Sequence, residues 1–152
     1  MTIKEMWKNY LESIGENEEN TEKSYDFWSF GNTKEEGGNL VKLILDGEKR
    51  ATTSLYSWYE TGDYDLPHLG QISVITDYNG IAKCITQIKK VSILPFYNVD
   101  EDFAYKEGEG DRSLECWRSV HKSFFSKELR KKGIEFTEDM LVICEEFEVI
   151  YK

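Results

Sequence analysis

The first hydrophobic pattern predicts a helix close to the start of the chain. Apolar and aromatic residues recur at helical spacing over residues 6–14 and end at Gly15. Thr2 and Glu5 precede them at the spacing of a capping box, in which each side chain bonds the other residue's backbone N–H. The polar stretch that follows, residues 16–23, predicts a solvated loop.

A second helix is predicted before Gly47. Thr33 and Glu36 repeat the capping-box spacing, and an apolar run over residues 40–45 stops at that glycine. The pair Gly37-Gly38 weakens the first turns, because glycine is a poor helix former, so we expect this helix to begin later than Thr33 suggests. A third helix starts after Ser113, and its apolar stripe is Leu114, Trp117, Val120, His121, Phe124 and Phe125.

Strands are predicted between and after these helices. Ile72, Val74 and Thr76 alternate with residues of the other face, and Asn79-Gly80 is typical of a two-residue hairpin turn. Residues 81–93 form the expected return strand, bounded by Pro95, and residues 141–151 a terminal strand. The acidic, glycine-containing stretch 100–111 is predicted to be a loop. Helices with a mostly antiparallel sheet indicate the α+β class, in one domain.

Charge narrows the classes of partner. The chain of 152 residues has a formal net charge of −10, which disfavours diffuse binding to long nucleic acid. Residues 112–132 run against this trend, with seven Lys or Arg against two Glu, and form either a solvated helix face or a local basic surface. Neither a signal peptide nor a membrane span is recognisable, so we expect a cytoplasmic protein.

Candidate chemistry is densest after Gly47. Two cations, Lys49 and Arg50, are followed by the hydroxyls of Thr52 and Ser54 and then by aromatic residues. Cations, hydroxyls and aromatic rings together suit a polar binding site in which aromatic side chains stack on the ligand. Cations beside a helix C-terminus also interact favourably with the helix dipole, so a purely structural role is the alternative. The cysteines and histidines lack the spacing of a zinc site, so we expect no metal and no cofactor.

These residues resemble a known family. The segment Gly47-x-Lys49-x-x-Thr52 is similar to the G-x-K-x-x-T-x-R motif of ASCH domains, which are related to PUA domains; Ser54 stands where the motif commonly has Arg. Further similar segments, in order, are Phe27-Trp28-Ser29-Phe30-Gly31, residues 103–111, Trp117-Arg118 with His121, and Glu146-Phe147-Glu148-Val149. The resemblance implies a single PUA-like domain over 1–152, with a helical part over 1–46 and a small β-barrel with inserted helices over 47–152.

The resemblance also implies a cleft for RNA or a modified nucleoside. Some small bacterial ASCH proteins remove the acetyl group from N4-acetylcytidine with Lys, Thr and Glu, which correspond here to Lys49, Thr52 and Glu107. In that reaction Thr52 would be the nucleophile, a partly neutral Lys49 its base, and Glu107 a proton shuttle. The remaining expected ligand-binding residues are Arg50, Ser54, Trp28, Trp58 and Tyr59.

Three functions stay open at this point. The first is an amidohydrolase that acts on an N4-acylated cytidine, the second is an RNA- or nucleotide-binding module without turnover, and the third is a ribonuclease. The net charge favours a neutral nucleoside over a long RNA, because each phosphate outside the 112–132 segment meets repulsion.

Overall fold

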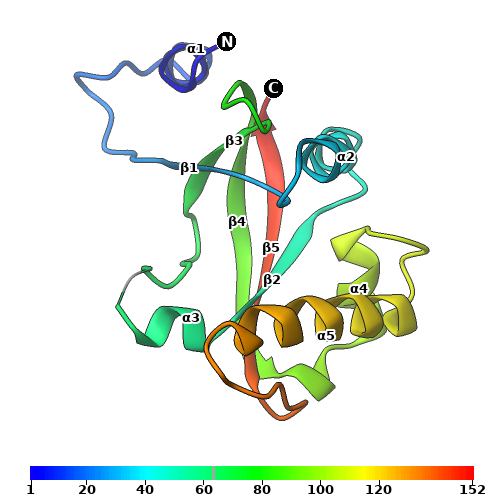
Figure 1. Cartoon of the computed structure of the whole chain (residues 1–152). Helices are drawn as coiled ribbons and strands as arrows, with labels where there is room; N and C mark the ends of the chain where they lie inside the picture. The colour runs from blue at the N-terminus through cyan, green and yellow to red at the C-terminus, as the bar shows by residue number, and fades with distance from the viewer. Residues whose placement is uncertain (63) are drawn as a thin grey trace. The chain divides into compact units, whose positions relative to one another are not determined.

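The computed structural model describes residues 1–62 and 64–152 and confirms the α+β class. The helices of the described residues are α1 (Ile3–Ser13), α2 (Lys34–Leu45), α3 (Ser57–Glu60), α4 (Glu101–Glu107) and α5 (Leu114–Arg130), with a 3-10 turn over Phe96–Asn98. The strands are β1 (Asp26–Ser29), β2 (Ala51–Leu55), β3 (Ile72–Thr76), β4 (Ala82–Pro95) and β5 (Leu141–Tyr151), as Figure 1 shows.

The chain divides into two compact units. Unit 1 contains residues 1–48, 69–89 and 147–152, and unit 2 contains residues 49–68 and 90–146. The two long strands, β4 and β5, contribute residues to both. The predicted single domain over 1–152 stays a prediction.

The capping signals of the sequence are confirmed. Thr2 and Glu5 form the complete capping box of α1, and the Thr33 hydroxyl accepts a hydrogen bond from the backbone of Glu36 at the start of α2. The expectation that α2 begins late is wrong, since the helix begins at Lys34. The backbone of Gly37 packs closely against Phe30, and a side chain would not fit there, because a Cβ at this position would lie 2.7 Å from the carbonyl oxygen of Phe30.

The sheet has the strand order β1-β3-β4-β5-β2. β3 pairs with β4 and β2 with β5 in antiparallel fashion, whereas β1 pairs with β3 in parallel. The predicted terminal strand matches β5, but β1 and β2 were not predicted. The prediction of a two-residue hairpin turn is wrong, because the turn between β3 and β4 spans residues 77–81. The Asp77 side chain stabilises this turn by accepting hydrogen bonds from the backbone N–H groups of Asn79 and Ile81.

The predicted loop over 100–111 is wrong in its first half. The Asp100 side chain accepts a hydrogen bond from the Phe103 backbone and begins α4, which ends at Glu107 because Gly108 adopts a left-handed conformation (φ +76°). The hydrophobic periodicity of the sequence does not predict this helix, because only two apolar residues in its two turns are buried, Phe103 and Ala104.

Unit 2 has one continuous core, on which α4 and α5 pack (Figure 1). Its buried members include Ala51 and Leu55 from β2, Phe96, and Trp117 and Phe125 from α5. Val120 was expected in the apolar stripe of α5 but is 49% exposed, because the buried positions follow the 117, 121, 125, 129 row.

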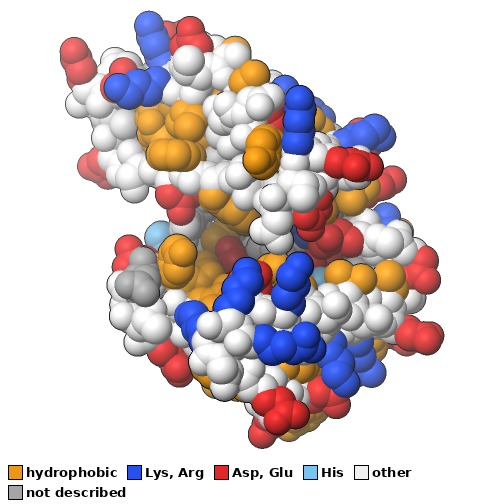
Figure 2. Space-filling model, in the orientation of Figure 1, with side chains coloured by type: hydrophobic (Ala, Val, Ile, Leu, Met, Phe, Trp, Pro, Cys, Tyr) orange, Lys and Arg blue, Asp and Glu red, His pale blue; other side chains and the backbone are white. Residues whose placement is uncertain are grey.

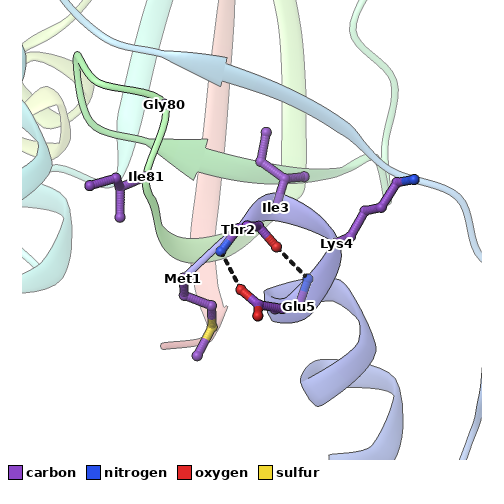
Figure 3. A pocket seen from close by; sticks show the side chains of 7 residues that line it. All are labelled: Met1, Thr2, Ile3, Lys4, Glu5, Gly80 and Ile81. Carbon is purple, nitrogen blue, oxygen red and sulfur yellow. Dashed lines mark hydrogen bonds between the residues drawn. The ribbon is translucent and has the colours of Figure 1, made fainter.

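Unit 1 holds two smaller cores, one against α1 and one against α2. A pocket beside the start of α1 is lined by Met1–Glu5, Gly80 and Ile81 (Figure 3). The hydrogen bonds drawn there are those of the capping box, so these polar groups serve the helix start. In the part of the chain described, no helix combines the length and the apolar character needed to cross a membrane.

Candidate functional site

A buried carboxylate is the centre of the site. Glu107, the last residue of α4, has a side chain that is only 2% exposed. Its Oε1 accepts hydrogen bonds from the Thr53 hydroxyl and from Trp117 Nε1 at 3.0 Å. Its Oε2 lies 3.0 Å from His121 Nε2 and 3.6 Å from Lys49 Nζ. Both oxygens are therefore engaged by protein donors.

Lys49 is buried beside this carboxylate. It lies between Gly47, whose left-handed φ of +78° turns the chain out of α2, and the first residue of β2. Lys49 Nζ donates to Ala51 O at 2.8 Å, to Glu109 Oε2 at 3.1 Å and to Glu107 O at 3.4 Å. An ammonium group with three N–H donors fits these oxygens. We call Lys49, Thr53, Glu107, Glu109, Trp117 and His121 the buried polar cluster.

The surroundings of His121 favour its doubly protonated form. Its Nδ1 lies 2.9 Å from the Trp117 carbonyl oxygen, which can only accept, and its Nε2 faces the Glu107 carboxylate. Burial lowers the pKa of His121, but the hydrogen bond and charge of Glu107 outweigh burial and raise that pKa above its usual value. The ring also stacks on Trp117, with centroids 4.4 Å apart.

The two glutamates of the cluster have opposite pKa shifts. Burial opposes ionisation of Glu107, yet Lys49 and His121 overcome it and hold the pKa well below its usual range. Burial raises the pKa of Glu109, and the neighbouring Glu107 adds to that effect against the attraction of Lys49. The opposite shifts distinguish two neighbouring carboxyl groups, and such a difference is typical of acid–base sites.

The same residues meet the spacing of a metal site. Glu107, Glu109 and His121 each offer an atom within 4.8 Å of the others, the one such group found among the described residues. Lys49 Nζ lies within 3.6 Å of both carboxyl groups, and the raised pKa of His121 disfavours the neutral ring that a metal ligand requires. A cation bound here would therefore compete with Lys49 and with the proton of His121.

The raised pKa of His121 predicts how stability depends on pH. The folded state keeps a proton that the unfolded chain releases near pH 6.5, so this contribution is complete below that pH and is lost as the pH rises through the folded pKa. We expect the melting temperature to fall between pH 6 and pH 9, and the fall to be smaller in His121→Gln. Equal slopes in the wild type and in His121→Gln would contradict the ion pair between His121 and Glu107.

The structure brings two of the three expected catalytic residues together, Lys49 and Glu107. The threonine in contact with Glu107 is Thr53, the neighbour of the expected Thr52. Because side chains alternate along β2, Thr52 lies on the opposite face with Ser54, where it pairs in register with Glu145.

The expected ligand-binding residues are spread over several environments. Ser54 Oγ and Tyr59 OH are 2.9 Å apart, and burial raises the pKa of Tyr59. Arg50 is exposed, and its backbone N–H donates to Lys106 O at 2.7 Å. Trp58 packs edge-on against Phe124 and Phe125 in the core of unit 2. Trp28 belongs to unit 1, where its ring packs on Phe30.

Sequence reasoning missed four members of the cluster: Thr53, Glu109, Trp117 and His121. The sequence pattern places His121 in the apolar stripe of this helix, and a histidine on the buried side of an amphipathic helix needs a polar partner, which is a usable signal. No buried side-chain N or O atom of the described residues lacks a hydrogen-bond partner, so the cluster is fully satisfied.

The basic segment of the sequence lies next to this cluster. α5 supplies Trp117 and His121 from its buried side, and its exposed side carries Arg118, Lys122, Lys127 and Arg130. Figure 2 shows Lys and Arg side chains gathered over the part of the surface that α5 occupies in Figure 1. One helix thus joins a basic surface to the buried polar cluster.

Comparisons with known proteins agree on one family. A family model described as ASCH domain matches residues 26–151. The crystal structure of an ASCH domain from Lactobacillus crispatus JV V101 is 40% identical, with a TM-score of 0.89 over 98% of this chain and 94% of that one. Protein EF3133 from Enterococcus faecalis V583 is 33% identical, with a TM-score of 0.86 over 98% of this chain and 88% of that one. Hypothetical protein PH0355 is 20% identical, with a TM-score of 0.51 over 83% of this chain and 98% of that one, a likeness of fold alone. No curated protein matches the chain.

Proposed function

Because the chain belongs to the ASCH domain family, whose PUA-like fold is an RNA-binding one, we propose that it recognises a modified nucleoside and hydrolyses an amide on its base. The proposed substrate class is an N4-acylated cytidine, free or at an accessible position of RNA. We propose that Lys49 and Glu107 pair with each other and position the other groups of the site, in place of the base and proton-shuttle roles that the resemblance implies for them.

The observation that carries this proposal is the buried polar cluster. Four ionisable groups are gathered in one place, and the side chains of Lys49 and Glu107 are each only 2% exposed. Buried ion pairs of this kind contribute little net stability, because desolvation offsets most of their attraction. A buried carboxyl group with a shifted pKa, next to a second carboxyl group that is partly exposed, is instead typical of a functional site.

A neutral nucleoside fits the charges better than a long nucleic acid. The chain carries a net charge of −10, so a ligand without phosphates meets no repulsion. Amide hydrolysis requires an attacking oxygen and a group that transfers a proton to the departing amine. A carboxyl group with a raised pKa, such as Glu109, suits that transfer.

The test is incubation of the protein with N4-acetylcytidine while its ultraviolet spectrum is followed toward that of cytidine. We expect turnover by the wild type, and we expect Lys127→Met, on the exposed side of α5, to keep it. Absence of turnover at high protein concentration would overturn the hydrolase proposal.

Thr52 is proposed as the hydroxyl nucleophile on the ground of the family resemblance alone, since its side chain lies on the face of β2 opposite to Thr53. Thr53, which bonds Glu107, provides a matched comparison. Thr52→Val should abolish hydrolysis at unchanged thermal stability. Thr53→Val should lower the free energy of unfolding by about 1.5–3 kcal/mol, the usual contribution of a hydrogen bond to a charged group. A fully active Thr52→Val protein would contradict the nucleophile role and leave water as the attacking group.

The second candidate function is RNA binding without turnover, and the exposed basic side of α5 favours it. Single-stranded RNA held by about four phosphate contacts should lose roughly 50-fold in affinity between 50 and 200 mM salt. Salt-dependent RNA binding in a protein that does not convert N4-acetylcytidine would place this function first.

A further inference from the structure

We propose that Glu109 is the residue of the buried polar cluster that exchanges protons with the ligand, while Glu107 stays ionised and holds the cluster together. This inference rests on the proposed amide hydrolysis and adds to it a residue that the sequence did not single out. The ligand it fits is a neutral amide whose nitrogen must leave as an amine.

Accessibility separates the two glutamates. The side chain of Glu109 is 32% exposed and that of Glu107 is 2% exposed, so only Glu109 can reach a bound molecule. Glu107 also has both oxygens occupied, by Thr53 and Trp117 on one side and by His121 and Lys49 on the other. Glu109 meets Lys49 through Oε2 at 3.1 Å, which orients the carboxyl group at the edge of the cluster.

The loop that carries Glu109 is held in an unusual conformation. Gly108, Gly110 and Arg112 all have left-handed φ angles, and Arg112 is the one non-glycine residue of this kind among those described. The Arg112 backbone N–H donates to Glu109 O at 3.1 Å, and its guanidinium lies 3.7 Å from the centre of the Tyr105 ring. Backbone strain of this kind persists where the surroundings over-determine it, often at functional sites.

The charges around Glu109 suit it to proton exchange. The titratable groups that face it are Lys49 before β2, Glu107 at the end of α4 and His121 on α5. Burial and Glu107 raise the pKa of Glu109, and Lys49 limits the rise. A carboxyl group with a raised pKa holds a proton more readily than an ordinary glutamate, which favours it as the group that donates the proton in general acid–base catalysis.

The step balances without a further reactant besides water. As the oxygen of the attacking hydroxyl or water bonds to the acyl carbon, its proton passes to the Glu109 carboxylate. When the C–N bond breaks, its electron pair stays on nitrogen, and the Glu109 carboxyl returns the proton there. Glu109 ends as a carboxylate. If the attacking oxygen is that of Thr52, the acyl group remains as an ester on Thr52; water then attacks this ester, one proton of that water passes to the departing Thr52 oxygen, and the free acid leaves. In either case water supplies in net terms a hydroxyl to the acyl group and a hydrogen to the amine.

Kinetics of Glu109→Gln test this role. We expect kcat for N4-acetylcytidine to fall by about 10²-fold or more, KM to change little, and the melting temperature to stay near that of the wild type. The wild-type kcat should fall as the pH drops below the pKa of Glu109, and this acid limb should be absent from the variant. Glu101→Gln, which changes an exposed glutamate of α4, should behave as the wild type. A Glu109→Gln protein with wild-type kcat would overturn the proposal.

Carboxyl NMR separates this proposal from the hydrolase proposal. In the protein labelled with ¹³C at the glutamate carboxyl carbons, one resonance should titrate above the usual glutamate range and be missing from Glu109→Gln. A Glu109 that titrates at or below the usual range would overturn the proton-exchange role even if the wild type hydrolyses the substrate. A wild type without turnover would overturn the hydrolase proposal and, with it, proton exchange between Glu109 and an amide nitrogen, whatever the titration of Glu109.

Discussion

Replacing Glu107 by glutamine is expected to lower the free energy of unfolding by about 3–5 kcal/mol, the usual loss when one partner of a buried ion pair is removed. The amide keeps the shape of the side chain but leaves Lys49 and His121 as buried cations without their central counter-charge. For a chain of this length the melting temperature should fall by roughly 10 °C. Thermal unfolding followed by circular dichroism at pH 7 measures both quantities.

Glu101→Gln is the matched control for this experiment. It makes the same chemical change in the same helix, at an exposed position in the first turn of α4. We expect a change within about 0.5 kcal/mol, as is usual for surface substitutions. If Glu107→Gln were as stable as this control, the ionised and fully bonded state of Glu107 would be refuted.

Replacing Lys49 by methionine is expected to have an effect of similar size, with a distinctive pH dependence. Methionine fills most of the volume of the lysine but removes the ammonium that lies between Glu107 and Glu109. The loss of stability should reach about 3–5 kcal/mol at pH 8, where both carboxylates are ionised and repel each other. It should be smaller at pH 5, because protonation of Glu109 relieves that repulsion.

Urea unfolding at the two pH values measures this difference. Lys127→Met, at an exposed position of α5, makes the same substitution away from the cluster. We expect its stability to follow that of the wild type at both pH values. A Lys49→Met protein that lost the same stability at pH 5 and pH 8 would show that Glu109 does not respond to Lys49.

The local sequence determined the helix starts and the class of fold. Thr2 with Glu5, Thr33 with Glu36, and Ser113 act on backbone N–H groups within three residues, so their positions could be read directly from the chain. The long strand β5 was likewise visible in its composition, but β1 was not, because its four residues are all exposed and depend on pairing with β3.

The family resemblance located Lys49 and Glu107. Their meeting in one cluster agrees with the sequence prediction, although 58 positions separate them in the chain. The choice between Thr52 and Thr53 as the partner of Glu107 could not be made from the motif. It depends on which face of β2 turns toward α4 and α5, and a shift of one residue reverses the two faces.

Only the tertiary structure decided what each charged side chain does. The sequence by itself established an α+β chain with capped helices, an acidic surface, a basic segment and the residues of an ASCH motif. It could not distinguish Glu107 from Glu109, which lie two positions apart in one acidic stretch. Their difference comes from long-range contacts, because Trp117 and His121 on α5 and Thr53 on β2 enclose Glu107 and leave Glu109 at the accessible edge. Burial and charge pairing are set by residues distant in sequence, and for that reason the protonation states of this site follow from the fold and not from the order of its residues.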